Sequence, residues 1–427
     1  MPQPPLYSWL SWLMFQLFGS NLFSTTLLKY LLIFFTFVYI SFIAEKIFKY
    51  QSTKFIALFS YLLMPSFAWH MHQGFTHTIL LGLGIMMSLH ALLLIKEETS
   101  VRNYIYIGFA LAIGLLGKYS FIIFMITILL SALAVPNFRK SLLNNKIIIS
   151  FLVFITLIGP HLIWLQQNFQ DIYIQTQDRL LINYDSLVIE KIKSIGSLLT
   201  SSLGFVTPLV FFFLITNWKE ILSRKNTFIK SDYEKIFSNF YQVLFLCSVL
   251  IIIFMTMPHF KVRWLHPIMM IFPFWLLLRI EREGEIKKKV RKRFVYFLIL
   301  LTSAVIIIRV FQTTFGPQFG IYGRLNIPII ETLEKIPREH FVNSIIHTDN
   351  YTLIAHLLAR FSNPMSYGKK LLNYNSELNF DKCIKISERN IDYEKVSDMG
   401  SANIVSTKFG DKEYKLYYLI LPKEDCI

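Results

Sequence analysis

The chain has 427 residues, of which 54% are hydrophobic, 16% aromatic and only 16% charged. An average soluble domain carries about 25% charged residues, so this composition excludes an ordinary globular protein and indicates several membrane spans. The net charge of +16 would suggest nucleic-acid binding in a soluble protein. Much of this basic excess lies in short loops between apolar segments, so we expect the lipid bilayer as a partner and no nucleic acid.

The N-terminal segment is not a signal peptide, because it has neither a basic stretch nor a cleavage site after a short apolar run. Pro4 and Pro5 precede the run Leu6–Phe18, which is rich in Trp, Phe and Leu and also holds Ser8 and Gln16. Proline at a helix start followed by such a run predicts a short helix that lies at the membrane surface.

Ten apolar segments after this helix are candidates for membrane spans. We therefore expect an all-α polytopic membrane domain with about ten spans. The segments lie at about 26–44, 55–69, 78–95, 104–117, 119–135, 147–166, 194–217, 240–257, 264–280 and 294–312.

Positive charge is unequal between the two alternating sets of loops. One set holds about 21 Lys and Arg, and the opposite set before the last span holds roughly six. The basic loops are residues 45–54, 96–102, 136–146, 218–239 and 279–293. The positive-inside rule predicts that these loops are cytoplasmic and that the other loops and the C-terminal region are outside.

This orientation bears on the largest basic run and on the N-terminus. The run Arg279 to Arg293, which holds the largest share of the charge, is either a topology anchor or a patch for anionic lipid. The orientation also puts Met1 outside before any span. We therefore expect the chain as printed to lack an N-terminal span.

Hydropathy drops near the end of the last span, and the residue pattern changes. Ile404–Thr407 and Lys415–Leu421 alternate between apolar and polar residues as strands do, whereas Tyr351–Phe361 has helical spacing. We therefore expect two domains: a multi-span domain at 1–312 and a small extracytoplasmic α/β domain at 313–427.

The cysteines exclude a disulfide-dense scaffold, because there are only three: Cys247, Cys383 and Cys426. Their spacing is not that of a zinc site either. Cys383 and Cys426 both fall in the domain predicted to lie outside, where disulfides persist, so we expect them to be paired.

The stretch Pro258–Pro267 holds Lys261, Arg263, Trp264 and His266 between two apolar runs. A charge facing hydrocarbon costs at least about 2.5 kcal/mol, so these side chains are expected at an interface or in a polar cavity. Arg263 is suited to hold two phosphate oxygens, and Lys261 to meet the same group as a single cation. Alternatively, both cations only extend toward water and Trp264 anchors the chain at the interface.

Further polar residues stand at span ends on the same side: His70, His72, His77, Lys118 and Asp171. The H-x-H spacing with a third histidine is compatible with a metal site. Histidines at the end of a span are more often interfacial hydrogen-bonding groups, so we expect no metal. Lys118 either neutralises a phosphate or only extends toward water, and Asp171 is either a proton acceptor or a solvated loop residue.

Five short motifs occur in a recognisable order. They are Gln3-Pro4-Pro5-Leu6-Tyr7, Thr76-His77-Thr78, Gly117-Lys118-Tyr119, Pro160-His161-Leu162-x-Trp164 followed by Gln167-Asn168, and Arg263-Trp264-Leu265-x-Pro267. Together they resemble the bacterial membrane glycosyltransferases related to dolichyl-phosphate-mannose protein mannosyltransferases, of the family 39 or lipid A aminoarabinose transferase type. The resemblance covers most of residues 1–280.

The resemblance implies a GT-C fold in the bacterial inner membrane. It also implies that a sugar is taken from a polyprenyl-phosphate carrier and transferred, with inversion, to an acceptor outside the cytoplasm, such as lipid A, lipopolysaccharide, another glycan or a protein. This reaction needs a base for the attacking hydroxyl and cations for the departing phosphate, and we expect no cofactor. We assign His77 and Asp171 to catalysis, Lys118, Lys261 and Arg263 to the donor phosphate, and Gln3, Tyr7, His161, Trp164, Trp264 and His266 to the substrate pocket.

The sequence departs from this family in its acidic residues. Relatives carry an acid in the first outer loop shortly before the two prolines, and nothing precedes Met1 here. A second acid, common at the head of a later span, is replaced by His77. The alternative function is therefore an inactive, truncated copy or a membrane scaffold. A secondary transporter is the weaker alternative, because the sequence shows neither ionisable residues near the middle of the spans nor an internal repeat.

Overall fold

The structure is a computed structural model that describes residues 3–72, 76–170, 187–222, 231–254, 269–319, 327–348, 350, 353–354, 356–357, 361, 365–367, 370–371, 380–388, 403–409 and 412–422. The chain divides into two compact units, Met1–Ser303 and Ala304–Ile427. The domain boundary expected at 312 stays a prediction.

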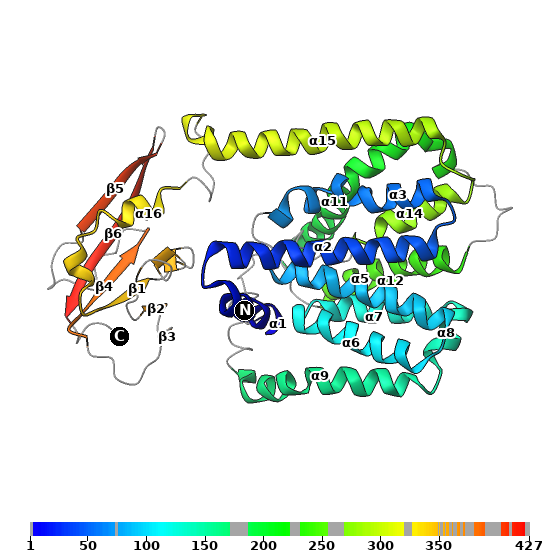
Figure 1. The fold of residues 1–427 in the computed structure, drawn as a ribbon, viewed down its shortest axis with the longest axis horizontal. Coiled ribbons are helices and arrows are strands. Elements are labelled where there is room, and N and C mark those ends of the chain that lie inside the picture. Colours follow the sequence, from blue (N-terminus) through cyan, green and yellow to red (C-terminus); the bar gives the residue numbers. More distant parts are fainter. Residues whose placement is uncertain are drawn as a thin grey trace. The chain divides into compact units, whose positions relative to one another are not determined.

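The first unit is built of α-helices, as the hydropathy pattern predicted (Figure 1). The helices are α1 (Leu6–Phe18), α2 (Leu22–Ile47), α3 (Gln51–Ser60), α4 (Pro65–Ala68), α5 (His77–Glu97), α6 (Val101–Gly117), α7 (Phe121–Leu133), α8 (Pro136–Leu142), α9 (Ile147–Gln167), α11 (Leu187–Leu222), α12 (Asp232–Phe254), α14 (Phe272–Glu281) and α15 (Lys288–Thr314), which extends into the second unit. Two 3₁₀ turns, η1 (Tyr61–Leu63) and η2 (His70–His72), lie between α3 and α5.

The helix expected at Leu6–Phe18 is confirmed with the same bounds. It ends at Gly19, whose φ of 81° is a conformation that residues with a side chain rarely adopt. Two residues later Asn21 caps α2, because its side-chain oxygen accepts from the amide of Ser24 at 2.9 Å. This tight turn sets where α1 lies against the start of α2.

The expected ten spans are not confirmed. Within the described ranges, six helices are long and apolar enough to cross a membrane, or seven if the bent pair α7 and α8 forms one span. The six are Leu22–Ile47, His77–Glu97, Ile147–Gln167, Lys191–Asn217, Asp232–Phe254 and Lys288–Thr314. The helix α6 is apolar but shorter, with 17 residues.

Proline explains two of the differences. The segment expected as one span at 55–69 is broken into α3, η1 and α4, because Pro65 cannot continue a helix and leaves Met64 extended. The segment at 119–135 ends where Pro136 begins α8, and the two helices are bent by 116°. Of the segment at 264–280, the described part contains the ten-residue helix α14.

Glycines allow the central helices to approach closely. A Cβ added to Gly84 on α5 would lie 2.4 Å from the Cα of Gly114 on α6, and one added to Gly108 would lie 2.4 Å from the carbonyl oxygen of Ser150 on α9. Small residues at such crossings let helix backbones approach in membrane proteins. The contacts place α6 beside both α5 and α9, as Figure 1 also shows.

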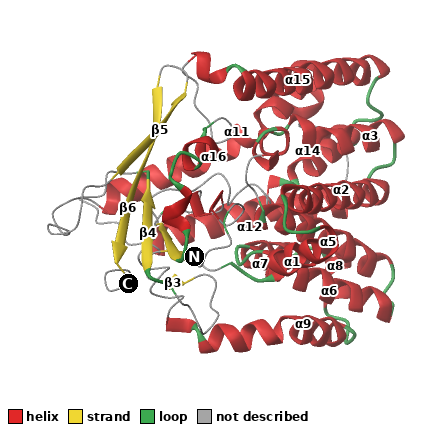
Figure 2. Ribbon diagram, turned by 60° about the vertical axis from the view of Figure 1, so that its left-hand side comes forward, coloured by secondary structure: helices red, strands yellow, loops and turns green. Residues whose placement is uncertain are grey.

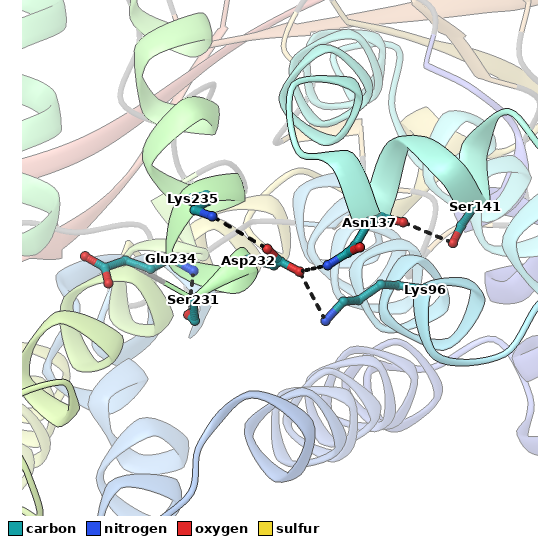
Figure 3. Close-up of polar contacts among 7 residues, drawn as sticks. All are labelled: Lys96, Asn137, Ser141, Ser231, Asp232, Glu234 and Lys235. Atoms are coloured by element: carbon teal, nitrogen blue, oxygen red, sulfur yellow. Dashed lines mark hydrogen bonds and ion pairs between the residues drawn. The ribbon is translucent and has the colours of Figure 1, made fainter. Parts of the chain in front are cut away.

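Polar contacts join the helices at one end of this unit. We call it the basic end: there α2 and α5 finish and α6, α9 and α12 begin. Asp232, at the start of α12, accepts from Nδ2 of Asn137 at 2.5 Å and lies 3.9 Å from the ammonium groups of Lys96 and Lys235 (Figure 3). Asp232 therefore ties α12 to α5 and α8.

The second unit contains a six-stranded sheet (Figure 2). Its strands are β1 (Ser344–Thr348), β2 (Met365–Tyr367), β3 (Lys370–Leu371), β4 (Lys382–Ser387), β5 (Asn403–Phe409) and β6 (Lys412–Pro422), in the order β3-β2-β1-β4-β6-β5. The strand β1 is parallel to β2 and β4, and the other pairs are antiparallel. Short helical pieces are η3 (Gly316–Phe319), α16 (Ile329–Leu333) and η4 (Arg338–Phe341).

This sheet agrees with the expected small α/β domain. Strands are confirmed at Ile404–Thr407 and Lys415–Leu421, whereas Tyr351–Phe361 lies mostly outside the described residues. Cys383 on β4 is in a disulfide. Cys426 lies outside the described residues, so its pairing with Cys383 stays a prediction.

Candidate active site

Two adjacent residues on α5 contact two adjacent residues at the end of α6. Nδ1 of His77 lies 3.2 Å from the carbonyl oxygen of Gly117, and the ammonium of Lys118 donates to the hydroxyl of Thr78 at 2.9 Å. Both contacts lie at the end of the helices opposite the basic end. The structure therefore brings the predicted residues His77 and Lys118 into one cluster.

The contact with Gly117 fixes the protonation of the His77 ring. A carbonyl oxygen only accepts hydrogen bonds, so Nδ1 of His77 must carry the proton in this contact. In the neutral ring, Nε2 then has a free lone pair and is able to accept a proton. His77 consequently has the form that a general base needs.

The position of Lys118 is set by the end of α6 and by its contact with α5. It follows the last residue of α6 in extended conformation and is half-buried, while its partner Thr78 is buried in the first turn of α5. A Cβ added to the preceding Gly117 would lie 3.1 Å from the side chain of Leu80, so α6 ends tightly against α5. The result is a positioned ammonium group at the end of two packed helices.

Tyr7 brings the N-terminal helix into the same cluster. Its ring centre lies 5.2 Å from that of His77, and its carbonyl oxygen accepts from the hydroxyl of Ser11 at 2.9 Å. Burial raises the pKa of the Tyr7 hydroxyl above its ordinary value, so the group stays neutral and able to donate. Of the other predicted residues, Gln3 is exposed at the start of the described chain.

A second cluster is formed by stacked aromatic rings. The hydroxyl of Tyr119 lies 2.9 Å from Nε2 of His161, and these two rings are inclined by 15°. Trp164, one turn further along α9, stacks on the His161 ring with 5.6 Å between the ring centres and is 43% exposed. An exposed ring that is stacked on a neighbouring ring is suited to stack against a flat apolar ligand face.

The remaining predicted residues are not placed. Asp171, Lys261, Arg263, Trp264 and His266 lie outside the described residues. Their assigned roles stay predictions. The whole stretch Pro258–Pro267 lies outside the described residues.

Sequence reasoning overlooked two partners in these clusters. Thr78 and Tyr119 stand in the quoted motifs, but neither was given a role. The available signal for a role was their position, because Thr78 directly follows His77 and Tyr119 directly follows Lys118. For metals, no group of three or more His, Cys, Asp or Glu suited to hold an ion occurs among the described residues.

Comparison with known proteins bears on the region that forms these clusters. Residues 2–164 match the family model described as dolichyl-phosphate-mannose-protein mannosyltransferase. Across 98% of this chain and 87% of the other, the structure resembles the crystal structure of ArnT from Cupriavidus metallidurans bound to undecaprenyl phosphate, with a TM-score of 0.59 and 11% sequence identity. At that identity, the likeness shows the fold.

These findings define the class of protein: the chain is a membrane glycosyltransferase of the GT-C type. Two similar relatives are lipopolysaccharide core galacturonosyltransferases of Rhizobium johnstonii. RgtB is 26% identical over 355 residues, and RgtA is 21% identical over 354 residues. Each match spans 82% of this chain and 70% of the relative.

Proposed function

We propose that this chain transfers a sugar from a polyprenyl-phosphate donor to an acceptor glycan of the cell envelope, outside the cytoplasm. The contact of Lys118 with Thr78, directly beside the oriented ring of His77, carries this proposal. It joins a cation suited to a phosphate with an imidazole suited to take a proton, and both lie in the region matched by the family model.

The chemistry assigns a task to each group. A hydroxyl of the acceptor attacks the anomeric carbon of the sugar and forms the new glycosidic bond, while the bond from that carbon to the phosphate oxygen breaks. His77 or Asp171 takes the hydroxyl proton, and the electron pair of the broken bond stays on the polyprenyl phosphate. Lys118, with Lys261 and Arg263, stabilises the charge that develops on this phosphate.

We further propose lipopolysaccharide core as the acceptor and galacturonic acid as the sugar. The names of the relatives RgtB and RgtA support this choice. The solved structure of ArnT with undecaprenyl phosphate supports undecaprenyl phosphate as the carrier. The exposed ring of Trp164 is suited to stack on the apolar face of one of the sugars.

Binding and transfer assays on the purified protein in detergent test the proposal. Radiolabelled undecaprenyl-phosphate galacturonic acid should bind and label a lipopolysaccharide core acceptor. Lys118→Met should weaken binding of undecaprenyl phosphate. Lys54→Met is the matched control, because it removes the same charge from a surface pair with Glu45 at the basic end.

The possible results separate the alternatives. Binding without transfer to any envelope acceptor would indicate an inactive copy or scaffold. No binding of a polyprenyl phosphate would overturn the proposal. Transfer of another sugar with undiminished dependence on Lys118 would correct the sugar and keep the reaction.

A further inference from the structure

An open groove of about 560 Å³ lies between α6 and α9, near the basic end. Its walls are mainly apolar side chains. On the surface of a water-soluble protein these side chains would be exposed to water. The residues that line it include Ile105 and Phe109 on α6, Leu152, Val153 and Leu157 on α9, and Arg102.

The close approach of the two helices creates this groove. Gly108 packs against the backbone of Ser150, whose hydroxyl donates to the carbonyl oxygen of Tyr104 at 2.7 Å. Because the backbones touch there, the larger side chains beside the contact, Ile105 and Leu152, stand outward on either side and remain 46% and 58% exposed. The groove is therefore a rigid feature of the helix pair.

Arg102 is the charged residue among those that line the groove. Arg102 is exposed in the first turn of α6, and no carboxylate lies within 4.0 Å of it in the part of the chain that the structure describes. The ammonium of Lys146 donates to the carbonyl oxygen of Thr99 at 2.6 Å, three residues before Arg102. The nearby Glu97 is engaged with Lys46 at 2.5 Å.

The helix itself adds to this charge. The first turn of α6 contains no acidic residue, so its positive dipole end and Arg102 have the same sign. A helix N-terminus with a cation beside it is a suitable place for a phosphate group. Charge complementarity at the mouth and the apolar walls below it thus point to one amphiphilic ligand.

We propose that this groove binds an anionic phospholipid. Its phosphate lies at Arg102 and the start of α6, and one acyl chain follows Ile105 and Phe109 on one wall and Leu152 on the other. From residue 102 to residue 109 the helix rises about 10 Å, which covers the upper part of an acyl chain. The site is separate from the candidate active site, because Lys118 is about 24 Å further along the same helix.

Native mass spectrometry of the full chain in detergent, titrated with phosphatidylglycerol, tests this inference. Arg102→Gln should weaken the tightest retained phosphatidylglycerol about fivefold. Arg139→Gln is the matched control, because Arg139 is an exposed cation of α8 at the same end but outside the groove. Arg139→Gln should leave the binding unchanged.

Two further measurements separate the lipid from other sources of phosphate. Thr156→Phe fills the groove and should weaken phosphatidylglycerol binding although Arg102 is intact. Inorganic phosphate at millimolar concentration should not displace the lipid, because it gains nothing from the apolar walls. Arg102→Lys should restore part of the affinity and so separates a loss of charge from a loss of folding.

The proposal is overturned if Arg102→Gln and Thr156→Phe bind phosphatidylglycerol as tightly as the parent. It is also overturned if phosphatidylcholine is retained equally well, because the mouth would then not select charge. Displacement by inorganic phosphate would show a simple anion site.

Discussion

The ammonium of Lys118 donates to the hydroxyl of Thr78 across the contact between α5 and α6, at 2.9 Å. Lys118→Met should lower kcat/KM about 100-fold, because it removes a cation from the departing phosphate. Thr78→Val should lower it only about fivefold, because the charge remains and one hydrogen bond is lost. Transfer assays with equal amounts of folded protein measure both. Equal effects of the two substitutions would show that Lys118 acts only through the fold.

His77→Asn separates the two nitrogens of the ring. The Asn amide is able to take the place of Nδ1 and donate to the carbonyl oxygen of Gly117, but nothing replaces Nε2. If His77 is the base, kcat falls about 100-fold or more with little change in KM. The decline of activity toward acid pH, where imidazole is protonated, should disappear in the variant. Full activity of His77→Asn would transfer the role of base to Asp171 or another group.

Gly84→Ala should destabilise the helix pair. Its new Cβ would lie 2.4 Å from the backbone of Gly114, so α5 and α6 must separate at a cost of about 1–3 kcal/mol. Thermal unfolding in detergent measures this cost as a lower Tm. Gly204→Ala is the control, because a Cβ there meets no heavy atom of the described residues within 4 Å. An unchanged Tm for Gly84→Ala would contradict the observed closeness of the helices.

Asp232→Ala should also lower the stability, by about 1–3 kcal/mol, because it leaves Asn137 and Lys96 without their shared acceptor. The Asp232 side chain is 20% exposed, so solvent only partly screens these contacts. Glu45→Gln offers a comparison, because its pair with Lys54 is more exposed and should contribute less than about 1 kcal/mol. Urea or thermal unfolding of the two variants tests the difference, and equal losses would contradict it.

The orientation of the bundle is tested by reporter fusions after Lys140, Lys288 and Gly400. The unequal charge of the loops predicts that the first two are cytoplasmic and the third extracytoplasmic. A periplasmic phosphatase reporter should be active only after Gly400. Activity of a cytoplasmic reporter at that position would reverse the proposed orientation.

Much of the fold followed from the sequence where one local rule dominates. Two prolines and an aromatic run were sufficient for α1, and alternation was sufficient for β5 and β6. The segment at 55–69 is not one continuous helix, because hydropathy alone does not register that Pro65 ends a helix. Here a local conformational restriction prevailed over composition.

The candidate site was predicted less completely. His77 and Lys118 were found because motifs mark them, but the contacts of Thr78 and Tyr119 depend on how α5, α6 and α9 align. No spacing within one segment encodes this alignment. The pairing depends on packing at Gly84, seven residues after His77, against Gly114, four residues before Lys118 on the other helix.

The glycine contact between α5 and α6 determines where this chain tolerates inserted residues. Residues 77 and 78 meet residues 117 and 118 because Gly84 and Gly114 hold the two helices at one relative height. The connection between these helices, residues 98–100, lies at the basic end. Insertions in this connection should therefore lengthen the hairpin there while the glycines keep His77 and Lys118 opposite their partners. A one-residue insertion between Gly114 and Lys118 would instead rotate the lysine by about 100° around the helix and away from Thr78.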